Sequence, residues 1–153
     1  PTDRALADDE GVIEMRVMVL VKGDEEYENG RMPNRDELAE MGAFNEELVK
    51  AGVMLAGEGL ANSTEGKRVR FEGKKATVID GPFTEAKELV AGYWIWEVAS
   101  IEEAAEWLKR APFQDTTVEI RRVFDESDFG EEFTEALREQ ERRIRDEAAA
   151  NDK

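Results

Sequence analysis

Residues 92–112 read GYWIWEVASIEEAAEWLKRAP, an aromatic strand that is followed at once by a helix. Aromatic and β-branched residues at the start of this stretch favour a strand. Ser100 and Glu103 then have the spacing of a capping box at a helix N-terminus. Pro112 is expected to end the helix, which is predicted over residues 101–110. The stretch therefore predicts one strand–helix unit.

A second strand–helix unit is predicted upstream. Residues 14–22 (EMRVMVLVK) have the composition and length of a strand that is apolar on both faces. Asn34 and Glu37 have capping-box spacing at the start of a helix that is predicted to run to about Ala51, and Gly52 suits the C′ position. The remaining core strands are predicted at residues 53–60 and 116–124.

Three further elements lie outside this core. Residues 68–71 and 75–79 flank a short turn that contains Gly73, which is typical of a β-hairpin. A short helix is predicted over residues 85–90, and a charged helix over residues 130–150.

The core order is strand, helix, strand, strand, helix, strand, with the hairpin inserted after the second strand. This is the ferredoxin-like βαββαβ pattern of an α+β protein, in which the helices cover one face of an antiparallel sheet. We expect Trp94 and Trp96 on the other face. Leaving aromatic area in water costs about 25 cal/mol per Å². A second copy packed sheet to sheet would cover it, so the sequence predicts a homodimer.

The composition restricts the possible partners. The chain has 153 residues, which suits one domain, and its net charge is −16. Such a charge repels nucleic-acid phosphates and anionic lipids, so neither nucleic acid nor membrane is an expected partner. Solubility alone also explains the acidity. No apolar run has the length of a membrane span and no signal-peptide core is present at the N-terminus, which favours the cytoplasm.

The chain has neither cysteine nor histidine. This excludes disulfides and cysteine nucleophiles and argues against a transition-metal site. The sequence also contains no P-loop and no nucleotide-binding glycine fingerprint, so no cofactor is expected. Any acid or base must therefore be a carboxylate, a lysine or a tyrosine with a shifted pKa.

Residues 78–112 (VIDGPFTEAKELVAGYWIWEVASIEEAAEWLKRAP) closely resemble the YCII-related, or DGPF-motif, proteins of bacteria. Further matching segments occur in the same order at residues 42–60, 67–71 and 118–124. The resemblance implies the dimeric α/β-barrel form of the ferredoxin-like fold. It divides the chain into an N-terminal arm (1–12), a YCII-related domain (13–128) and a charged C-terminal helix (129–153).

The resemblance implies two possible functions. The wider superfamily looks like a source of small lyase- or isomerase-type enzymes, and many DGPF proteins are encoded beside extracytoplasmic-function sigma factors or fused to them. Relatives of the YCII type have a histidine on the first helix and an aspartate as a proposed active pair. This chain has no histidine, and the matching helix position falls near Met41. Of that pair only the aspartate of the motif, Asp80, has a counterpart here.

Asp80 is the candidate catalytic residue. A carboxylate at a strand end beside a cleft could act as a general base if burial raised its pKa. Its structural alternative is a turn residue, because Asp-Gly-Pro is itself a turn sequence. Arg68 and Arg70 share one face of the hairpin and could bind a small anionic ligand. They could equally form salt bridges with the many acidic residues of the chain.

Three other residues are candidates for ligand binding. Glu58 lies between two glycines, where other atoms can come close. Lys87 lies on the short helix after the motif and could reach the same cleft or belong to a solvated face. Trp94 could stack on an aromatic ligand, or lie in the core and at the dimer interface.

Two functions follow. The chain could be an enzyme or binding protein for a small anionic or aromatic compound, with Asp80 as base and the hairpin arginines as ligands. Alternatively, it could be a regulatory module that contacts a protein such as a sigma factor, through the charged helix at residues 130–153.

Overall fold

The computed structural model describes residues 14–83 and 88–151. The chain divides into two compact units, one that ends at Arg122 and one that begins at Val123. Each unit is described by itself.

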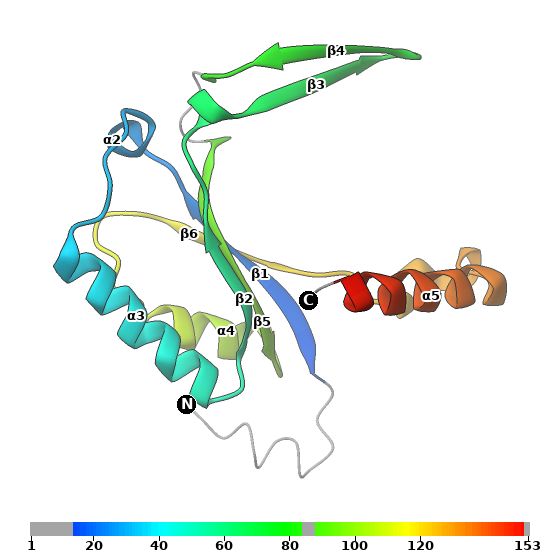
Figure 1. The fold of residues 1–153 in the computed structure, drawn as a ribbon. Coiled ribbons are helices and arrows are strands. Elements are labelled where there is room, and N and C mark those ends of the chain that lie inside the picture. The colour runs from blue at the N-terminus through cyan, green and yellow to red at the C-terminus, as the bar shows by residue number, and fades with distance from the viewer. Residues whose placement is uncertain (1–13, 84–87, 152–153) are drawn as a thin grey trace. The chain divides into compact units, whose positions relative to one another are not determined.

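The first unit contains a four-stranded antiparallel sheet with the strand order β2-β5-β1-β6. Its strands are β1 (Met15–Lys22), β2 (Met54–Gly59), β5 (Val90–Val98) and β6 (Val118–Arg122). Helices α3 (Arg35–Lys50) and α4 (Ile101–Leu108) lie together on one side of this sheet (Figure 1). The predicted α+β, ferredoxin-like class is confirmed.

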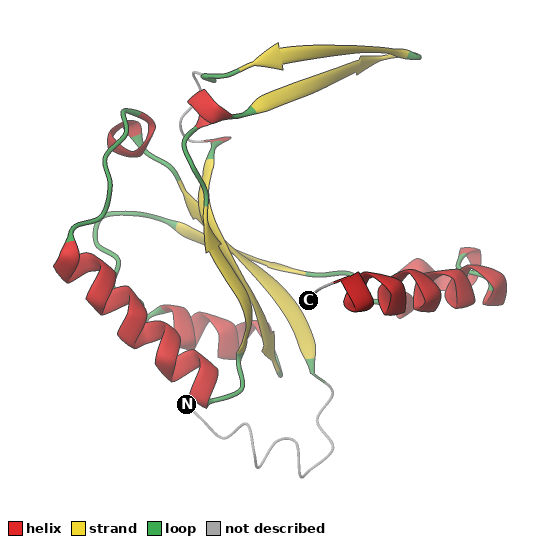
Figure 2. Cartoon of the chain, in the orientation of Figure 1, coloured by secondary structure: helices red, strands yellow, loops and turns green. Residues whose placement is uncertain are grey.

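A second, two-stranded sheet consists of β3 (Lys67–Glu72) and β4 (Lys75–Asp80), the predicted hairpin. Figure 2 shows it as a ribbon of its own, separate from the four-stranded sheet. In the described part of the first unit, two short elements were not predicted: helix α2 (Glu25–Glu28) and the 3₁₀ turn η1 (Ser63–Glu65). Half of the predicted helix over residues 85–90, namely 85–87, lies outside the described residues, and Val90 already belongs to β5.

Helix α3 begins and ends as its sequence predicts. The backbone amide of Glu37 donates to the side-chain oxygen of Asn34, and the Glu37 carboxylate accepts from the backbone amide of Asn34, both at 2.9 Å. The Asn34 amide, together with a bidentate Arg31, holds the pKa of Glu37 below its usual range. Gly52 follows the helix at a φ of 74°, a left-handed conformation that suits glycine.

At α4 the predicted capping box forms in part. The amide of Glu103 donates to Ser100 Oγ at 3.0 Å, whereas the Glu103 carboxylate accepts from the amide of Ala99, one residue before the cap.

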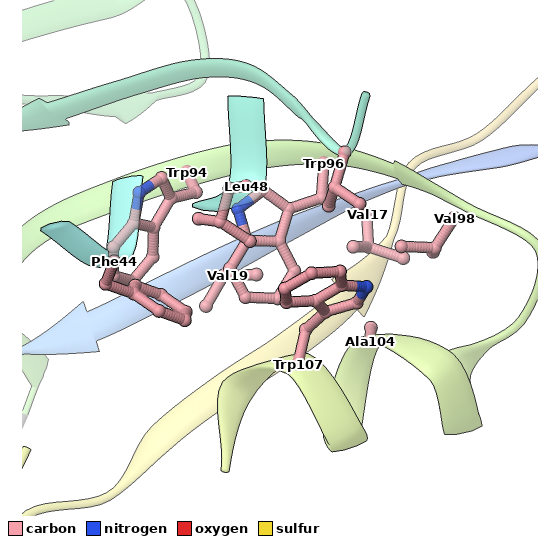
Figure 3. Packing of buried hydrophobic residues seen from close by; sticks show 10 residues of the cluster. Val17, Val19, Phe44, Leu48, Trp94, Trp96, Val98, Ala104 and Trp107 are labelled. Carbon is pink, nitrogen blue, oxygen red and sulfur yellow. The ribbon is translucent and has the colours of Figure 1, made fainter. Parts of the chain in front are cut away.

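The core lies between the sheet and the two helices (Figure 3). Phe44 of α3 packs edge-on against Trp94 and Trp96, with ring centroids 5.8 and 6.4 Å apart. Trp107 of α4 lies in the same cluster. The buried cluster comprises Val17, Val19, Phe44, Leu48, Val53, Trp94, Trp96, Val98, Ala104 and Trp107.

The expectation that Trp94 and Trp96 lie on the uncovered face is wrong. Trp96 pairs with Val17 and is fully buried against the helices, and Trp94 is 5% exposed. Side chains alternate along a strand, so the assignment depends on a single residue of register. Because β1 and β5 are apolar on both faces, the sequence pattern did not fix that register. The argument that a second copy must cover these tryptophans therefore fails.

The face opposite the helices carries a different apolar group, paired across β1 and β5: Met18 with Ile95, and Leu20 with Tyr93. We call this side of the four-stranded sheet the open face. Around the apolar group lie charged side chains, among them Glu119, which pairs with Lys22 and with Arg121 at 3.2 Å each. Hydrogen bonds from Lys22 and Arg121 keep the pKa of Glu119 below its usual range.

The second unit contains the 3₁₀ segment η3 (Glu126–Glu132) and helix α5 (Glu135–Asn151). Phe129 contacts Phe124 and Phe133, with ring centroids 5.3 and 5.6 Å apart. The predicted helix begins later than expected, because Gly130 has a φ of 63° and interrupts the helical path. Over the described residues, no helix has the length and apolar character needed to cross a membrane.

Candidate functional site

A pocket of about 240 Å³ lies between the four-stranded sheet and α3. Its floor is formed by three glycines on the helix-facing side of the sheet: Gly57 and Gly59 on β2, and Gly92 on β5. Gly57 pairs with Trp94, and Gly59 pairs with Gly92. A Cβ added at Gly59 would meet nothing within 4 Å, so this end of the sheet leaves open space below α3, whereas the Trp94 ring already covers the Cβ position of Gly57.

The walls of the pocket are apolar. Met41 and Asn45 are one turn apart on α3 and line the same side, since residues four apart share a helix face. Val21 of β1, Trp94 of β5 and Phe113, which follows α4, complete the lining. Trp94 and Phe113 meet edge-on with ring centroids 6.1 Å apart. The site therefore offers two aromatic rings and a thioether to a ligand.

Asn45 supplies the polar side chain of the pocket. The indole N–H of Trp94 donates to Asn45 Oδ1 at 2.9 Å. This bond assigns the oxygen of the amide, because a donor requires an acceptor opposite it. The NH₂ group of Asn45 is then the donor available to a ligand.

Two charged residues near the pocket, Glu58 and Arg31, are directed elsewhere or already paired. Glu58 lines the pocket but pairs with Tyr93, so strand alternation directs its side chain to the open face. A wider groove next to the pocket includes Arg31, which pairs with Glu37 at 2.7 Å and with Glu26 at 3.6 Å. The pocket thus suits an uncharged compound.

The loop after β2 is held by Tyr27 of α2. Its hydroxyl lies 2.9 and 2.8 Å from the carbonyl oxygens of Leu60 and Ala61. Burial, together with the nearby Glu28 carboxylate, raises the pKa of the Tyr27 phenol, so it remains a donor. This contact fixes the end of β2 next to Gly59.

A chain of hydrogen bonds continues from this loop to the DGPF turn. Ser63 is buried, and both its amide and its hydroxyl donate to the Glu28 carboxylate. Ser63 Oγ in turn accepts from the amide of Phe83 at 2.8 Å. The Gly81–Pro82 peptide bond is cis. The motif therefore serves here to join the base of the hairpin to the loop around Ser63.

The predicted catalytic residue lies on the hairpin. Asp80 ends β4, its side chain is 74% exposed, and it pairs with Lys67 across the ladder at 2.5 Å. Its register partner belongs to β3, and Asp80 is not among the residues that line the pocket. The structure does not bring Asp80 together with Trp94 or Glu58 in one pocket.

The two hairpin arginines also lie outside the pocket. Arg68 places its guanidinium 4.0 Å from the centre of the Phe83 ring, a cation–π contact. Arg70 is exposed opposite Thr77. Lys87 lies outside the described residues. Of the predicted ligand-binding residues, Glu58 and Trp94 line the pocket.

Sequence reasoning missed most of this pocket. Asn45 and Phe113 gave no local signal, because an amide on a helix and a phenylalanine after one are ordinary. The sequence feature that could have indicated the pocket is the set of glycines Gly57, Gly59 and Gly92. Glycines within strands often mark positions where a ligand or another backbone comes close.

The fold and the pocket define a ferredoxin-like α+β domain with an apolar pocket between the sheet and α3. The family model for the YCII-related domain matches residues 15–127, and the chain belongs to this family. A protein of Rhizobium meliloti (strain 1021), described as uncharacterized, is 28% identical over 97 residues, which is 62% of this chain and 78% of that protein. Neither comparison names an activity.

Proposed function

We propose that this YCII-related domain binds a small, uncharged aromatic compound that carries a hydrogen-bond acceptor. The observation that carries the proposal is the pocket of about 240 Å³ with a glycine floor, aromatic walls and the Asn45 amide. An apolar cavity of roughly 150 Å³ holds benzene. A substituted ring therefore fits the larger volume here.

The charge of the ligand follows from the lining. A charged group would lose its hydration without gaining a paired partner, which costs several kcal/mol or displaces its pKa. Among the lining residues, Asn45, Met41, Trp94 and Phe113 offer an amide, a thioether and two aromatic rings, and the glycines expose backbone. Glu58 and Tyr93 pair with each other on the strand positions that face the open side of the sheet. This favours the aromatic form of the predicted ligand over the anionic one.

The binding test uses three probes of similar size: acetophenone, benzoate and benzylammonium. The ¹⁵N-labelled protein has three tryptophans, so its indole N–H resonances are few. Acetophenone is expected to shift the Trp94 resonance saturably, while the Trp107 resonance, from outside the pocket, serves as internal reference. Benzoate and benzylammonium are expected to bind at least about tenfold more weakly. Equal affinity for all three probes would contradict an uncharged site.

Two substitutions assign the binding to this pocket. A Cβ added at Gly59 meets nothing within 4 Å, so Gly59→Val should fill the hollow, abolish the acetophenone shift and leave the free energy of unfolding within about 1 kcal/mol. Gly42→Ala, which also meets nothing, is the matched control on the exposed side of α3 and should bind normally. Acetophenone binding that survives Gly59→Val would place the probe elsewhere.

Asn45→Asp separates the two halves of the amide. The carboxylate still accepts the Trp94 indole N–H but has no donor to offer. The Trp94 resonance should remain while acetophenone affinity falls.

We also propose that the chain forms a homodimer across the open face. The supporting observation is the apolar group Met18, Leu20, Tyr93 and Ile95 at the centre of a sheet face that no helix of the first unit covers. An apolar centre with a charged border is the usual arrangement of a protein interface. The family resemblance, which implies a dimeric barrel, supports the same assembly.

Ile95→Glu is expected to dissociate the dimer, because it places a carboxylate in the centre of the apolar group. Sedimentation equilibrium should show a monomer with unchanged circular dichroism. Val49→Glu adds the same charge at a 59% exposed position on α3 and should leave the dimer intact. A wild-type protein that sediments as a monomer at micromolar concentration would refute the assembly.

A further inference from the structure

The β3–β4 hairpin, hereafter the arm (residues 67–80), has an exposed apolar side. Val69 pairs with Val78, and Phe71 pairs with Ala76, so these four side chains share one face of the ladder. Phe71 is 73% exposed, Val78 60% and Val69 49%. The other face carries Arg68 and Arg70, opposite Ile79 and Thr77.

An isolated two-stranded ribbon of this kind is at best marginally stable in water. The contacts that hold it are at its base, where the Gly81 amide donates to the Gly66 carbonyl at 3.0 Å and Arg68 covers Phe83. Phe71 lies far along the ladder from that base, next to the turn at Gly73. Large apolar side chains so exposed at the end of a ribbon indicate a surface that binds another one.

The charge of the arm indicates what that other surface is. The arm contains five basic and two acidic residues, whereas the whole chain carries −16. The arm is therefore +3 and the remainder −19. Opposite charge steers association and fixes orientation. The chain's own acidic remainder, presented by a second molecule, complements the arm.

The small size of the open face also favours a second copy of this chain as the partner of the arm. A standard interface uses roughly 20–30 residues on each side. The pairing places fewer than that on the open face: Arg16, Met18, Leu20, Lys22, Ala56, Glu58, Tyr93, Ile95, Glu97, Glu119 and Arg121. A reciprocal pair of arms would supply additional apolar contact area.

We infer that the arm is an intersubunit clamp: the apolar side made of Val69, Phe71, Ala76 and Val78 packs on the sheet domain of a second copy of this chain. The inference rests on the homodimer proposed above and adds a second surface to it. In the dimer each subunit gives one arm and receives one.

The first test measures dimer dissociation constants by sedimentation equilibrium. Phe71→Ser should weaken the dimer at least about tenfold, since buried aromatic anchors dominate interfaces. Met32→Ser removes an apolar side chain of similar exposure, 78%, from outside the arm and should change nothing. An unchanged constant for Phe71→Ser, with Ile95→Glu still monomeric, would overturn the clamp and leave the open-face dimer standing.

The second test locates the arm directly. The chain has no cysteine, so Lys74→Cys in the turn gives a single spin-label site. Spin-labelled ¹⁴N protein is mixed with unlabelled ¹⁵N protein, and broadening can then arise only between subunits. We expect broadened amides in residues 15–59 or 90–122 of the ¹⁵N copy. Broadening no greater than that from a free nitroxide would overturn the clamp.

The reverse labelling tests whether the apolar side of the arm instead contacts the C-terminal unit of its own chain. Here spin-labelled ¹⁵N protein is diluted into excess unlabelled ¹⁴N protein, so any broadening that remains within residues 123–151 is intramolecular. Strong broadening there, without broadening between subunits, would assign the arm to its own chain and overturn the inference.

Discussion

Replacing Trp96 by alanine is expected to lower the free energy of unfolding by about 3–5 kcal/mol, the usual cost of deleting a large buried aromatic side chain. Trp96 is fully buried between β1, β5 and the helices, in contact with Phe44 and Trp94. The alanine variant would leave a cavity that this ring cluster cannot close. Urea denaturation followed by far-UV circular dichroism measures the loss.

Two comparisons make the result specific. Leu38→Ala, at a 59% exposed position of α3, should cost less than about 1 kcal/mol. Trp96→Phe should cost much less than the alanine change. The indole N–H of Trp96 has no hydrogen-bond partner among the described residues, and removing a buried unpaired donor recovers about 1–3 kcal/mol. A Trp96→Ala protein as stable as wild type would mean that the ring is not in the core.

Gly81→Ala should lower stability by about 3 kcal/mol or more, at the upper end of overpacking effects. The added Cβ would stand 1.7 Å from the carbonyl oxygen of Ser63 and 2.8 Å from its carbon. Both atoms belong to the backbone, so the turn and the loop must separate. The hydrogen bond from the Phe83 amide to Ser63 Oγ would then be lost, and hydrogen exchange at that amide should become fast.

Gly66→Ala is the matched control in the same loop. Its Cβ would make ordinary contacts at 3.6 Å or more, and its φ of −111° is accessible to any residue. This variant should unfold at nearly the wild-type urea concentration. If Gly81→Ala and Gly66→Ala behaved alike, close packing at the DGPF turn would not explain why glycine occupies position 81.

The sequence predicted the order of core elements because each has a local signal. The capping residues Asn34 and Glu37, the C′ glycine Gly52 and the aromatic strand at Val90–Val98 all act within a few neighbouring residues. Such signals do not depend on what the rest of the chain does.

The features that were predicted wrongly, or not predicted, depend on distant residues. Which side of β5 faces the helices is decided by one residue of register against β1, and both sides are apolar. The pocket is formed by residues from α3, β2, β5 and the segment after α4, so no single stretch indicates it. Asp80 was chosen from its motif alone; its carboxylate is exposed and paired with Lys67, and its catalytic role stays a prediction.

The glycine floor has a consequence for selectivity. A site shaped by large side chains usually loses stability when it is redesigned, because each change disturbs neighbours. At Gly59 a new side chain would enter empty space, so alanine, valine and leucine in turn should set a graded upper limit on the dimensions of the guest. Substitutions at this single residue can therefore change which ligands bind, with little effect on the stability of the surrounding fold.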